Sequence, residues 1–394
     1  MKWETMKLSD CCNSIADGDH QPPPKANQGV PFVTIANINS YNEFDFSNTM
    51  FVPEEYYQNL ASKRKAQKGD VLYSVVGSFG IPVLIKDNKP FVFQRHIAIL
   101  RPNKKILSSF LYYTMLSKDF YSKADAVALG AAQRTISLTS LRNIEIQVPT
   151  VQFQHKVVDI LSAYDNLIEN KQKQIKLLEE AAQRLYKEWF VDLRFPGHET
   201  IPIVDGVPEG WSYANLKEIA DVVMGQSPKS EFYNNKNQGL PFHQGVGSYG
   251  DRFVIDNTYS TSYTRIAKKN SILFSVRAPV GRMNITKNQV VIGRGLASII
   301  HKKGLQSFLF YQLKDMFYKD NLVGNGSIFA SISKNELLQL KLLVPSFELV
   351  KKYNDIISVI DKRIENIDNQ KNLAQEARDR LLPKLMNGEI EVKN

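Results

Sequence analysis

The sequence predicts an α+β protein with two β-rich domains, each followed by a long helix, and with the two helices packed as an antiparallel coiled coil of pseudo-two-fold symmetry. Three observations support this prediction: two apolar seams of helical period, short β-type segments between turn residues, and a repetition of the first half of the chain in the second. A chain of 394 residues is long enough to hold two or more cores. The expected boundaries are 1–150 and 196–345 for the domains, with a linker at 196–210, and 151–195 and 346–394 for the helices.

The composition narrows the class of protein. A hydrophobic content of 43% and a charged content of 23% are typical of a soluble globular protein. Because no long apolar run and no basic-then-apolar leader is present, we expect a cytoplasmic protein with no membrane partner. Cys11 and Cys12 are adjacent and lack spaced Cys or His partners, so we expect neither a metal site nor a disulfide framework. The net charge of +10 favours a polyanionic partner.

The first domain should be mostly β-structure. Breakers such as Gly69-Asp70 and Asp87-Asn88 separate short apolar runs, which is the pattern of strands in an all-β region. One helix is expected at 108–117, before a loop rich in glycine and alanine around Gly130. The expected strands are 30–38, 71–76, 81–85, 91–100 and 144–148.

An apolar seam with a period of about 3.5 residues follows the first domain, at 151–190. At about 1.5 Å per residue this helix would be roughly 60 Å long, which suits an element that holds two domains apart. Lys171 interrupts the seam, either as a polar layer that sets register or as a side chain that extends from the seam edge. The seam consists of Val157, Leu161, Tyr164, Ile168, Lys171, Ile175, Leu178, Ala182, Leu185 and Trp189.

The second half of the chain repeats this order with a period of about 200 residues. The segment 239–242 (GLPF) matches 29–32 (GVPF), and 307–311 (SFLFY) matches 109–113 (SFLYY). The helix text DNLIEN also returns, as DKRIEN. The second seam consists of Tyr353, Ile357, Ile360, Ile364, Ile367, Lys371, Ala374, Arg378, Leu381 and Leu385.

The linker length favours antiparallel helices. Parallel packing would require the residues 195–210 to run back along the whole helix, roughly 60 Å, which they could barely span when fully extended. Antiparallel packing would instead place one domain at each end of the helix pair.

The sequence contains no catalytic motif that we recognise. A phosphate-binding loop, a nucleophile elbow, a zinc-binding His-Glu-x-x-His helix, and methyltransferase and nuclease motifs are all missing. Gly324-Asn325-Gly326 is a lone glycine pair without a third glycine, which indicates a loop rather than a nucleotide site. We therefore expect a non-catalytic protein that needs no cofactor.

These features in this order resemble the specificity subunit of a type I restriction-modification system, over essentially the whole chain. The resemblance is carried by 69–77 (GDVLYSVVG), its copy at 270–277, the segment 133–141 (QRTISLTSL), the Val-Pro pairs at 148–149 and 344–345, and the two seams. It implies that each β-rich domain is a target-recognition domain that reads one half of a split DNA sequence, with the helices as the spacer. It also implies partners: double-stranded DNA, two methyltransferase (modification) subunits and, through them, the restriction/translocase subunits.

Base reading requires Arg, Lys, Asn or Gln side chains on loops, and anchoring of the DNA backbone requires cations nearby. The repeat aligns Arg95 with Arg294 and, more loosely, the turns around Gly77 and Arg277, although shared positions can equally serve folding. Arg277 and Arg282, which flank the turn 278–281, are preferred for specificity. The candidate DNA-binding residues are Lys63, Arg64, Lys65, Gln94, Arg95 and Arg134 in the first domain and Arg252, Arg265, Lys268, Lys269, Arg277, Arg282 and Arg294 in the second.

One alternative of another class stays open. The chain would then be a coiled-coil scaffold that joins two β-rich domains for carbohydrate or peptide ligands and has no role on DNA. A mobility-shift test on random DNA separates the two hypotheses.

Overall fold

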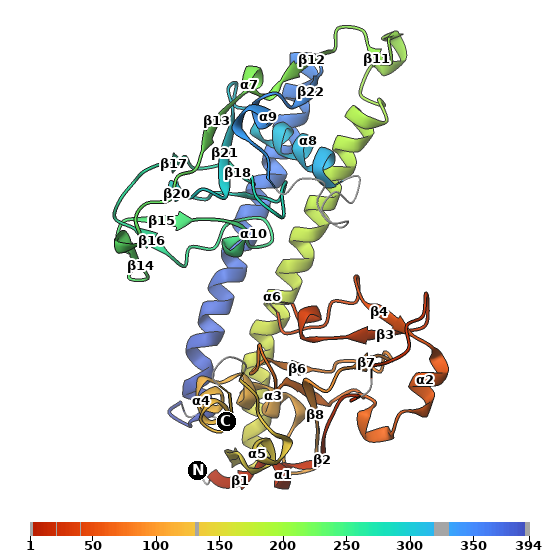
Figure 1. The fold of residues 1–394 in the computed structure, drawn as a ribbon, viewed down its shortest axis with the longest axis vertical. Helices are drawn as coiled ribbons and strands as arrows, with labels where there is room; N and C mark the ends of the chain where they lie inside the picture. Colours follow the sequence, from red (N-terminus) through yellow and green to blue (C-terminus); the bar gives the residue numbers. More distant parts are fainter. Residues whose placement is uncertain (1–2, 21, 40, 131–133, 319–330, 391–394) are drawn as a thin grey trace. The chain divides into compact units, whose positions relative to one another are not determined.

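The computed structural model describes residues 3–20, 22–39, 41–130, 134–318 and 331–390. The chain divides into two compact units, Met1–Asn170 with Gln370–Asn394, and Lys171–Asn369 (Figure 1). The two predicted long helices are present, as α6 (Val151–Tyr186) and α10 (Phe347–Met386). Each unit therefore contains one domain and a part of each long helix.

The first unit contains a mixed α/β domain. Its strands are β1 (Trp3–Lys7), β2 (Cys12–Asp17), β3 (Val30–Val33), β4 (Met50–Val52), β5 (Val71–Ser74), β6 (Pro82–Leu84), β7 (Val92–Phe93), β8 (Ile97–Pro102) and β9 (Glu145–Pro149). Its short helices are α1 (Leu8–Cys11), α2 (Glu54–Asn59), α3 (Ser108–Leu116), α4 (Lys118–Ala126) and α5 (Leu138–Asn143).

Two sheets and a strand pair organise this domain. The sheet of order β2-β8-β5-β6 is antiparallel, whereas the sheet of order β4-β3-β7 contains a parallel pair, β3 with β7. β1 pairs with β9, which joins the start of the domain to its end. Strand β5 is buried on both faces, so its sequence is apolar without alternation, and α3 is buried nearly all round for the same reason.

The second unit repeats these elements. Its strands are β10 (Ile203–Val204), β11 (Val207–Pro208), β12 (Ser212–Asn215), β13 (Ala220–Met224), β14 (Tyr233–Asn234), β15 (Leu240–His243), β16 (Tyr259–Ser260), β17 (Ile266–Ala267), β18 (Ile272–Ser275), β19 (Met283–Ile285), β20 (Val290–Ile292), β21 (Leu296–His301) and β22 (Lys341–Val344). Its short helices are α7 (Leu216–Ile219), α8 (Gln306–Tyr318) and α9 (Lys334–Leu338).

The register of the strands confirms the internal repeat. The sheet β13-β21-β18-β19 corresponds to β2-β8-β5-β6, and the pair β12 with β22 corresponds to β1 with β9. The parallel pair recurs as well: Phe32 lies opposite Val92 in the first domain, and Phe242 lies opposite Val291 in the second. Equivalent residues of the two domains can therefore be assigned from main-chain pairing.

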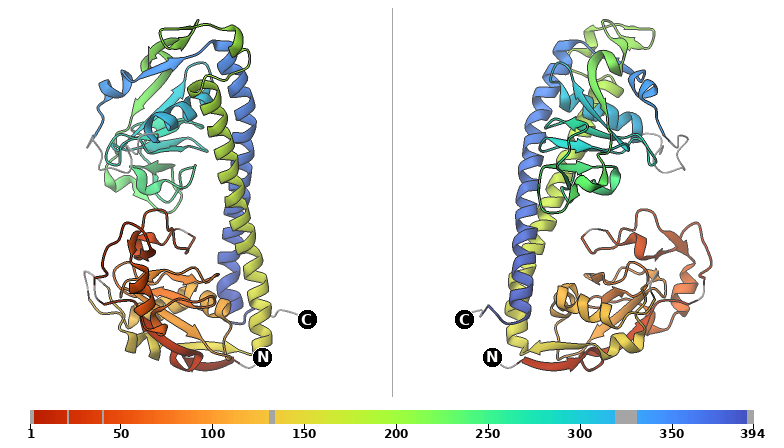
Figure 2. Two further views of the ribbon diagram at one scale, coloured as in Figure 1. Left: turned by 90° about the vertical axis from the view of Figure 1, so that its right-hand side faces the viewer. Right: turned by 60° about the vertical axis from the view of Figure 1, so that its left-hand side comes forward.

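The apolar seams are buried within each unit. In the first unit, Val157 and Leu161 of α6 share a core with Leu382 and Leu385 of α10. In the second unit, Ala182 of α6 shares a core with Tyr353 and Ile357 of α10. Figure 2 gives two further views, with α6 in yellow to green and α10 in blue. Among the described residues, no helix is long and apolar enough to cross a membrane.

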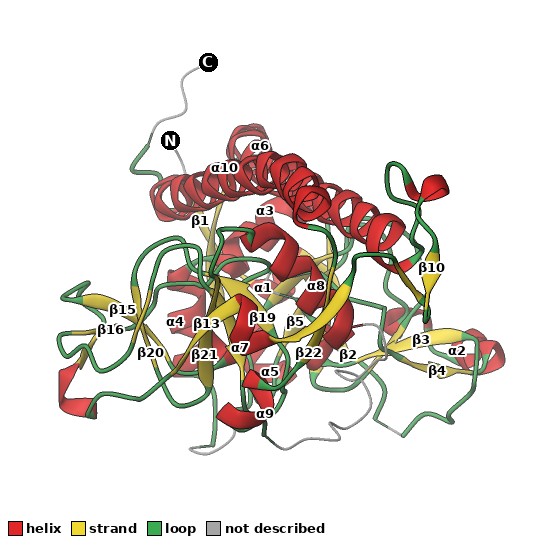
Figure 3. Ribbon diagram, turned by 90° about the horizontal axis from the view of Figure 1, so that it is seen from above, coloured by secondary structure: helices red, strands yellow, loops and turns green. Residues whose placement is uncertain are grey.

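Several local predictions differ from the structure. Short helices are packed among the strands of both domains, so the domains are mixed rather than mostly β (Figure 3). The expected strand 91–100 is interrupted by a turn between β7 and β8, and the expected strand 30–38 ends at Val33 because Thr34 caps the 3-10 turn Ile35–Asn37. The linker contains the hairpin β10–β11. Gly324-Asn325-Gly326 and Gln133 lie outside the described residues.

Candidate nucleic-acid interface

The basic turn of the first domain packs beside β2. Lys63 is exposed in the 3-10 turn Ser62–Arg64, and Lys65 donates a 2.8 Å hydrogen bond to the carbonyl of Gln58. The half-buried guanidinium of Arg64 lies 3.5 Å from Asp19. Of these three cations, Lys63 is exposed and the other two are half-buried.

A second turn of the first domain joins β7 to β8 and carries Gln94 and Arg95. The side chain of Arg95 is exposed. The backbone N–H of Arg95 donates a 3.0 Å hydrogen bond to the backbone carbonyl of Asp19, and the carboxylate of Asp19 faces Arg64. Gln94 is half-buried in the same turn. Arg134 lies elsewhere and donates a 3.1 Å hydrogen bond to the carboxylate of Asp125. The structure thus brings Arg64, Gln94 and Arg95 together around Asp19.

Arg252 is buried in the second unit. The sequence predicted it as a DNA-binding residue, which would require an exposed side chain. Its side chain is 1% exposed, and its guanidinium donates hydrogen bonds to Glu179 of α6 (3.0 Å) and to Asp361 of α10 (2.5 Å). It also donates to the phenol oxygen of Tyr311 at 3.0 Å and lies 4.3 Å from the ring centroid of Phe310. Arg252 therefore fastens the domain to the helix segments of its own unit.

The charge balance keeps Arg252 protonated. Burial lowers the pKa of Arg252, but the carboxylates of Asp361 and Glu179 raise it, and the net direction is upward. Ser307 donates a 2.6 Å hydrogen bond to the second carboxylate oxygen of Asp361. Because these carboxylates are mostly withdrawn from water, removing the cation would leave the charge of Asp361 without compensation and Glu179 paired with Lys314 at 3.9 Å.

The remaining cations of the second domain lie at its surface. Arg265, Lys268 and Arg282 are exposed, and Lys269 is exposed with its ammonium 3.9 Å from a carboxylate oxygen of Glu365. An exposed ion pair at this distance contributes little energy and leaves the cation available to a polyanion.

Arg277 and Arg294 face one pocket of about 170 Å³. Arg277 follows β18, and Arg294 stands in the turn between β20 and β21. Gln244, directly after β15, lines the same pocket. The sequence pointed to both arginines but gave no indication that they lie together.

Sequence reasoning missed Gln244 and the acidic residues on the helices. The signal for Gln244 was present, because it directly follows the repeated segment GLPF–His and is a base-reading residue type. Asp165 and Asp361 are the first residues of the repeated helix segments DNLIEN and DKRIEN. Their hydrogen-bonding tyrosines, Tyr113 and Tyr311, are the last residues of the repeated segments SFLYY and SFLFY.

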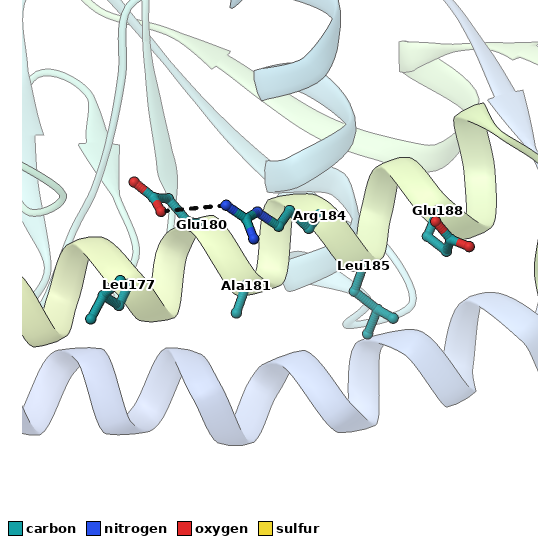
Figure 4. A pocket seen from close by; sticks show the side chains of 6 residues that line it. All are labelled: Leu177, Glu180, Ala181, Arg184, Leu185 and Glu188. Atoms are coloured by element: carbon teal, nitrogen blue, oxygen red, sulfur yellow. Dashed lines mark ion pairs between the residues drawn. The ribbon is translucent and has the colours of Figure 1, made fainter.

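Helix α6 carries an open depression of about 440 Å³ in the second unit (Figure 4). Leu177, which lines it, is 64% exposed. Arg184 and Glu180 form an ion pair of 4.0 Å at its edge. Its lining residues are Leu177, Glu180, Ala181, Arg184, Leu185 and Glu188.

The described residues contain no group of three or more His, Cys, Asp or Glu side chains placed to hold a metal ion. Cys11 and Cys12 are buried and free. Burial raises the pKa of the Cys11 thiol to about 11 and that of Cys12 to about 12. Both thiols are therefore protonated and unreactive near neutral pH.

Two similar mixed α/β domains, each with an arginine on a turn of the same construction and each joined to long helices, define a duplicated recognition protein. The family model of the type I restriction modification DNA specificity domain matches residues 1–180 and 208–375, so the chain belongs to this family. It is a type I restriction-modification specificity subunit with two target-recognition domains, a non-catalytic component of such a system.

Individual relatives match over nearly the whole chain. The putative type I restriction enzyme MjaX specificity subunit of Methanocaldococcus jannaschii is 31% identical over 405 residues, which cover 99% of this chain and 94% of that protein. The HindI specificity subunit of Haemophilus influenzae is 23% identical and covers 98% of this chain and 99% of its own. The crystal structure of the type I S subunit from M. genitalium shares the fold, with a TM-score of 0.56 at 17% identity over 100% of this chain and 97% of that one.

Proposed function

We propose that the chain recognises a bipartite double-stranded DNA target, one half with each domain, and that it docks two methyltransferase subunits and, through them, the restriction subunits. The proposed recognition domains are 1–150 and 196–345, and the proposed spacer helices are 151–195 and 346–394. Location in the cytoplasm remains a prediction.

The observation that carries this proposal is a shared main-chain frame that presents different side chains. Val75 N–H donates to the carbonyl of His96 at 2.8 Å, and Val276 N–H donates to the carbonyl of Gly295 at 2.9 Å. Beside this frame the side chains differ, because Val76 bridges to Thr135 in the first domain where Arg277 bridges to Ser331 in the second. Two half-sites of different sequence require this combination of a constant backbone and variable contacts.

We propose that the exposed cations contact the DNA and that the half-buried polar residues support them. Arg252 is left out of the proposed interface because its guanidinium is enclosed and pairs with Glu179 and Asp361. The exposed set is Lys63, Arg95, Arg265, Lys268, Lys269, Arg277, Arg282 and Arg294, and the supporting set is Arg64, Lys65, Gln94 and Arg134.

For the helices we propose an antiparallel coiled coil that sets the distance between half-sites. In the first unit, the late residue Arg378 of α10 donates a 2.7 Å hydrogen bond to Asp165, before the middle of α6. In the second unit, the early residue Tyr353 of α10 donates a 3.1 Å hydrogen bond to the carbonyl of Ala182, late in α6. Within the first unit, the earlier α6 residues Val157 and Leu161 share a core with Leu382 and Leu385, which lie later in α10 than Arg378. Within the second unit, the earlier α6 residue Ile175 clusters with Ile364 and Ile367, which lie later in α10 than Tyr353. This opposite order of residue numbers supports antiparallel packing within each unit.

Exposed apolar side chains on the helices support the docking of partner subunits. Leu177 on α6 is 64% exposed, and Val359 and Leu373 on α10 are 66% and 65% exposed. Large apolar side chains at a surface often mark contact sites for other proteins. We assign the depression beside Leu177 in Figure 4 to such a contact.

An exchange of one domain tests the proposed function. Residues 200–345 are replaced by the corresponding segment of a relative, the chimera is assembled with methyltransferase subunits, and the methylated sites are sequenced. We expect one half of the target to change and the other half to persist. A change in both halves, or in neither, would contradict independent reading, and failure of the wild-type chain to shift DNA would favour a scaffold without a role on DNA.

A further inference from the structure

We propose that Gln244, Arg277 and Arg294 form the base-reading centre of the second domain and that this centre recognises guanine through its major-groove edge. The inference rests on the proposed function, because it takes double-stranded DNA as the ligand. It assigns the two arginines to sequence discrimination rather than to a general attraction for phosphates.

The three side chains line one pocket. All three are exposed, and the described lining residues include no carboxylate. Within the described ranges, neither guanidinium forms an ion pair or a hydrogen bond, in contrast to the buried Arg252, which pairs with Glu179 and Asp361. The two cations therefore face solvent with their donors available.

The backbone that carries these side chains is held firmly. Gly295 N–H donates to the carbonyl of Gln244 at 3.2 Å, and Gly293 N–H donates to the carbonyl of His243 at 2.8 Å. Arg277 forms a β-bridge with Ser331. A Cβ atom at Gly295 would lie 2.4 Å from the carbonyl oxygen of Gln244, so the close approach of the two segments requires glycine there. A preorganised backbone of this kind is what a specific site needs.

The strand register identifies the corresponding residues of the first domain. The parallel pairs Val33 with Phe93 and His243 with Ile292 are equivalent, so Thr34 corresponds to Gln244 and Arg95 to Arg294.

A second equivalence comes from an isolated bridge. Val76 bridges to Thr135 as Arg277 bridges to Ser331, so Val76 takes the place of Arg277. The sequence alone had aligned Arg277 with the turn around Gly77. Only the arginine at 95 and 294 is common to both domains, while the other two positions differ in chemistry at a shared backbone position. This is the pattern expected of residues that distinguish one half-site from the other.

Guanine is the base that fits two arginines best. Its major-groove edge presents two acceptors, O6 and N7, which the paired N–H groups of a guanidinium match in a bidentate contact. Gln244 adds an amide donor and acceptor for the adjacent base. The half-site of the second domain should therefore contain guanine at the positions read by Arg277 and Arg294.

The test uses the full chain assembled with its methyltransferase subunits. Arg277→Val introduces the residue that the first domain carries at this position, so the frame should accept it. Lys236→Ala, which removes an exposed cation from the turn between β14 and β15, is the matched control. Binding is measured on duplexes that carry each base at each position of the half-site read by the second domain, and the methylated motif is sequenced.

We expect Arg277→Val to lose about 5- to 150-fold of discrimination at one guanine, the range for one bidentate contact, and to leave the other half-site unchanged. Lys236→Ala should leave the motif unchanged. Replacing that guanine by 7-deazaguanine should weaken binding by the wild-type chain but not by Arg277→Val, and this measurement holds even if other variants fold poorly.

Three results would overturn the inference: a half-site without guanine, an unchanged motif in Arg277→Val, or an equal loss of affinity on every sequence with a weaker salt dependence. The last result would identify a phosphate clamp. Failure of the wild-type complex to bind any DNA would instead refute the proposed function itself.

Discussion

The phenol of Tyr113 donates a 2.6 Å hydrogen bond to one carboxylate oxygen of Asp165 on α6. Arg378 of α10 donates a 2.7 Å hydrogen bond to the other oxygen, so one carboxylate joins the first domain to both helix segments of its unit. Asp361 holds the corresponding place in the second unit, but its cation, Arg252, comes from the domain. The repeat therefore preserves the carboxylate and changes the source of its counter-charge.

Asp165→Asn should destabilise the first unit. Burial and the hydrogen bond to Asp165 raise the pKa of Tyr113, so the phenol stays a donor that needs this acceptor. Because asparagine keeps the shape but loses the charge, we expect a loss of about 1.5–3 kcal/mol in the free energy of unfolding, measured by urea denaturation. The exposed Asp159→Asn on the same helix is the control and should change stability by less than about 0.5 kcal/mol. Equal effects of the two changes would argue against a special role for Asp165.

Arg252→Met should be among the most damaging single changes in the second unit. It leaves the mostly buried Asp361 without its cation and Glu179 paired with Lys314 at 3.9 Å, and removing one partner of a buried pair costs about 3–5 kcal/mol. The control Lys269→Met removes a cation whose ammonium is exposed and 3.9 Å from Glu365, worth about 0–1 kcal/mol. Denaturant unfolding of both variants decides the point, and a mild effect of Arg252→Met would show that water compensates the carboxylates.

His301 should make stability depend on pH. Burial and the nearby Lys303 lower its pKa from 6.5 to about 4, and its Nδ1 accepts hydrogen bonds from the backbone N–H groups of Lys303 (3.1 Å) and Leu305 (3.3 Å). Between pH 6.5 and about pH 4, the histidine is protonated in the unfolded chain but stays neutral in the folded chain. The free energy of unfolding therefore keeps its full value above this window and declines as the pH falls through it.

The expected decline is at most about 3.5 kcal/mol, since the pKa falls from 6.5 to about 4 and each pKa unit corresponds to about 1.4 kcal/mol. His301→Gln removes the titrating group, so the difference in unfolding free energy between wild type and variant should narrow as the pH falls through this window. A constant difference across the window would show that His301 titrates normally.

The length of α6 should set the spacing of the half-sites. Four residues inserted after Lys171 add about 6 Å of helix, close to two base pairs at about 3.4 Å each, and keep the seam partly in phase. A single inserted residue rotates the downstream seam by about 100° and should damage folding instead. The spacer in the sites methylated by the assembled complex is the measurement. An unchanged spacer in a stable four-residue variant would favour a mobile connection between the domains.

The sequence alone determined the two long helices, the repeat and, in the first domain, the strands β3, β5, β6 and β9. The seams were visible because their periodicity is a local property, and all their apolar positions, from Val157 to Leu385, are buried or half-buried. The family resemblance and the candidate arginines also came from the sequence, including Arg277 and Arg294. The structure added that these two share a pocket with Gln244.

Only the tertiary structure decided which cations are available to a ligand. Arg252 and Arg277 look alike in the sequence, yet one is enclosed and the other exposed. The partners of Arg252 lie 73 and 109 residues away in the chain, on α6 and α10. Whether a guanidinium is neutralised inside the protein or left to face solvent depends on such distant carboxylates, and no local pattern around the arginine encodes their approach.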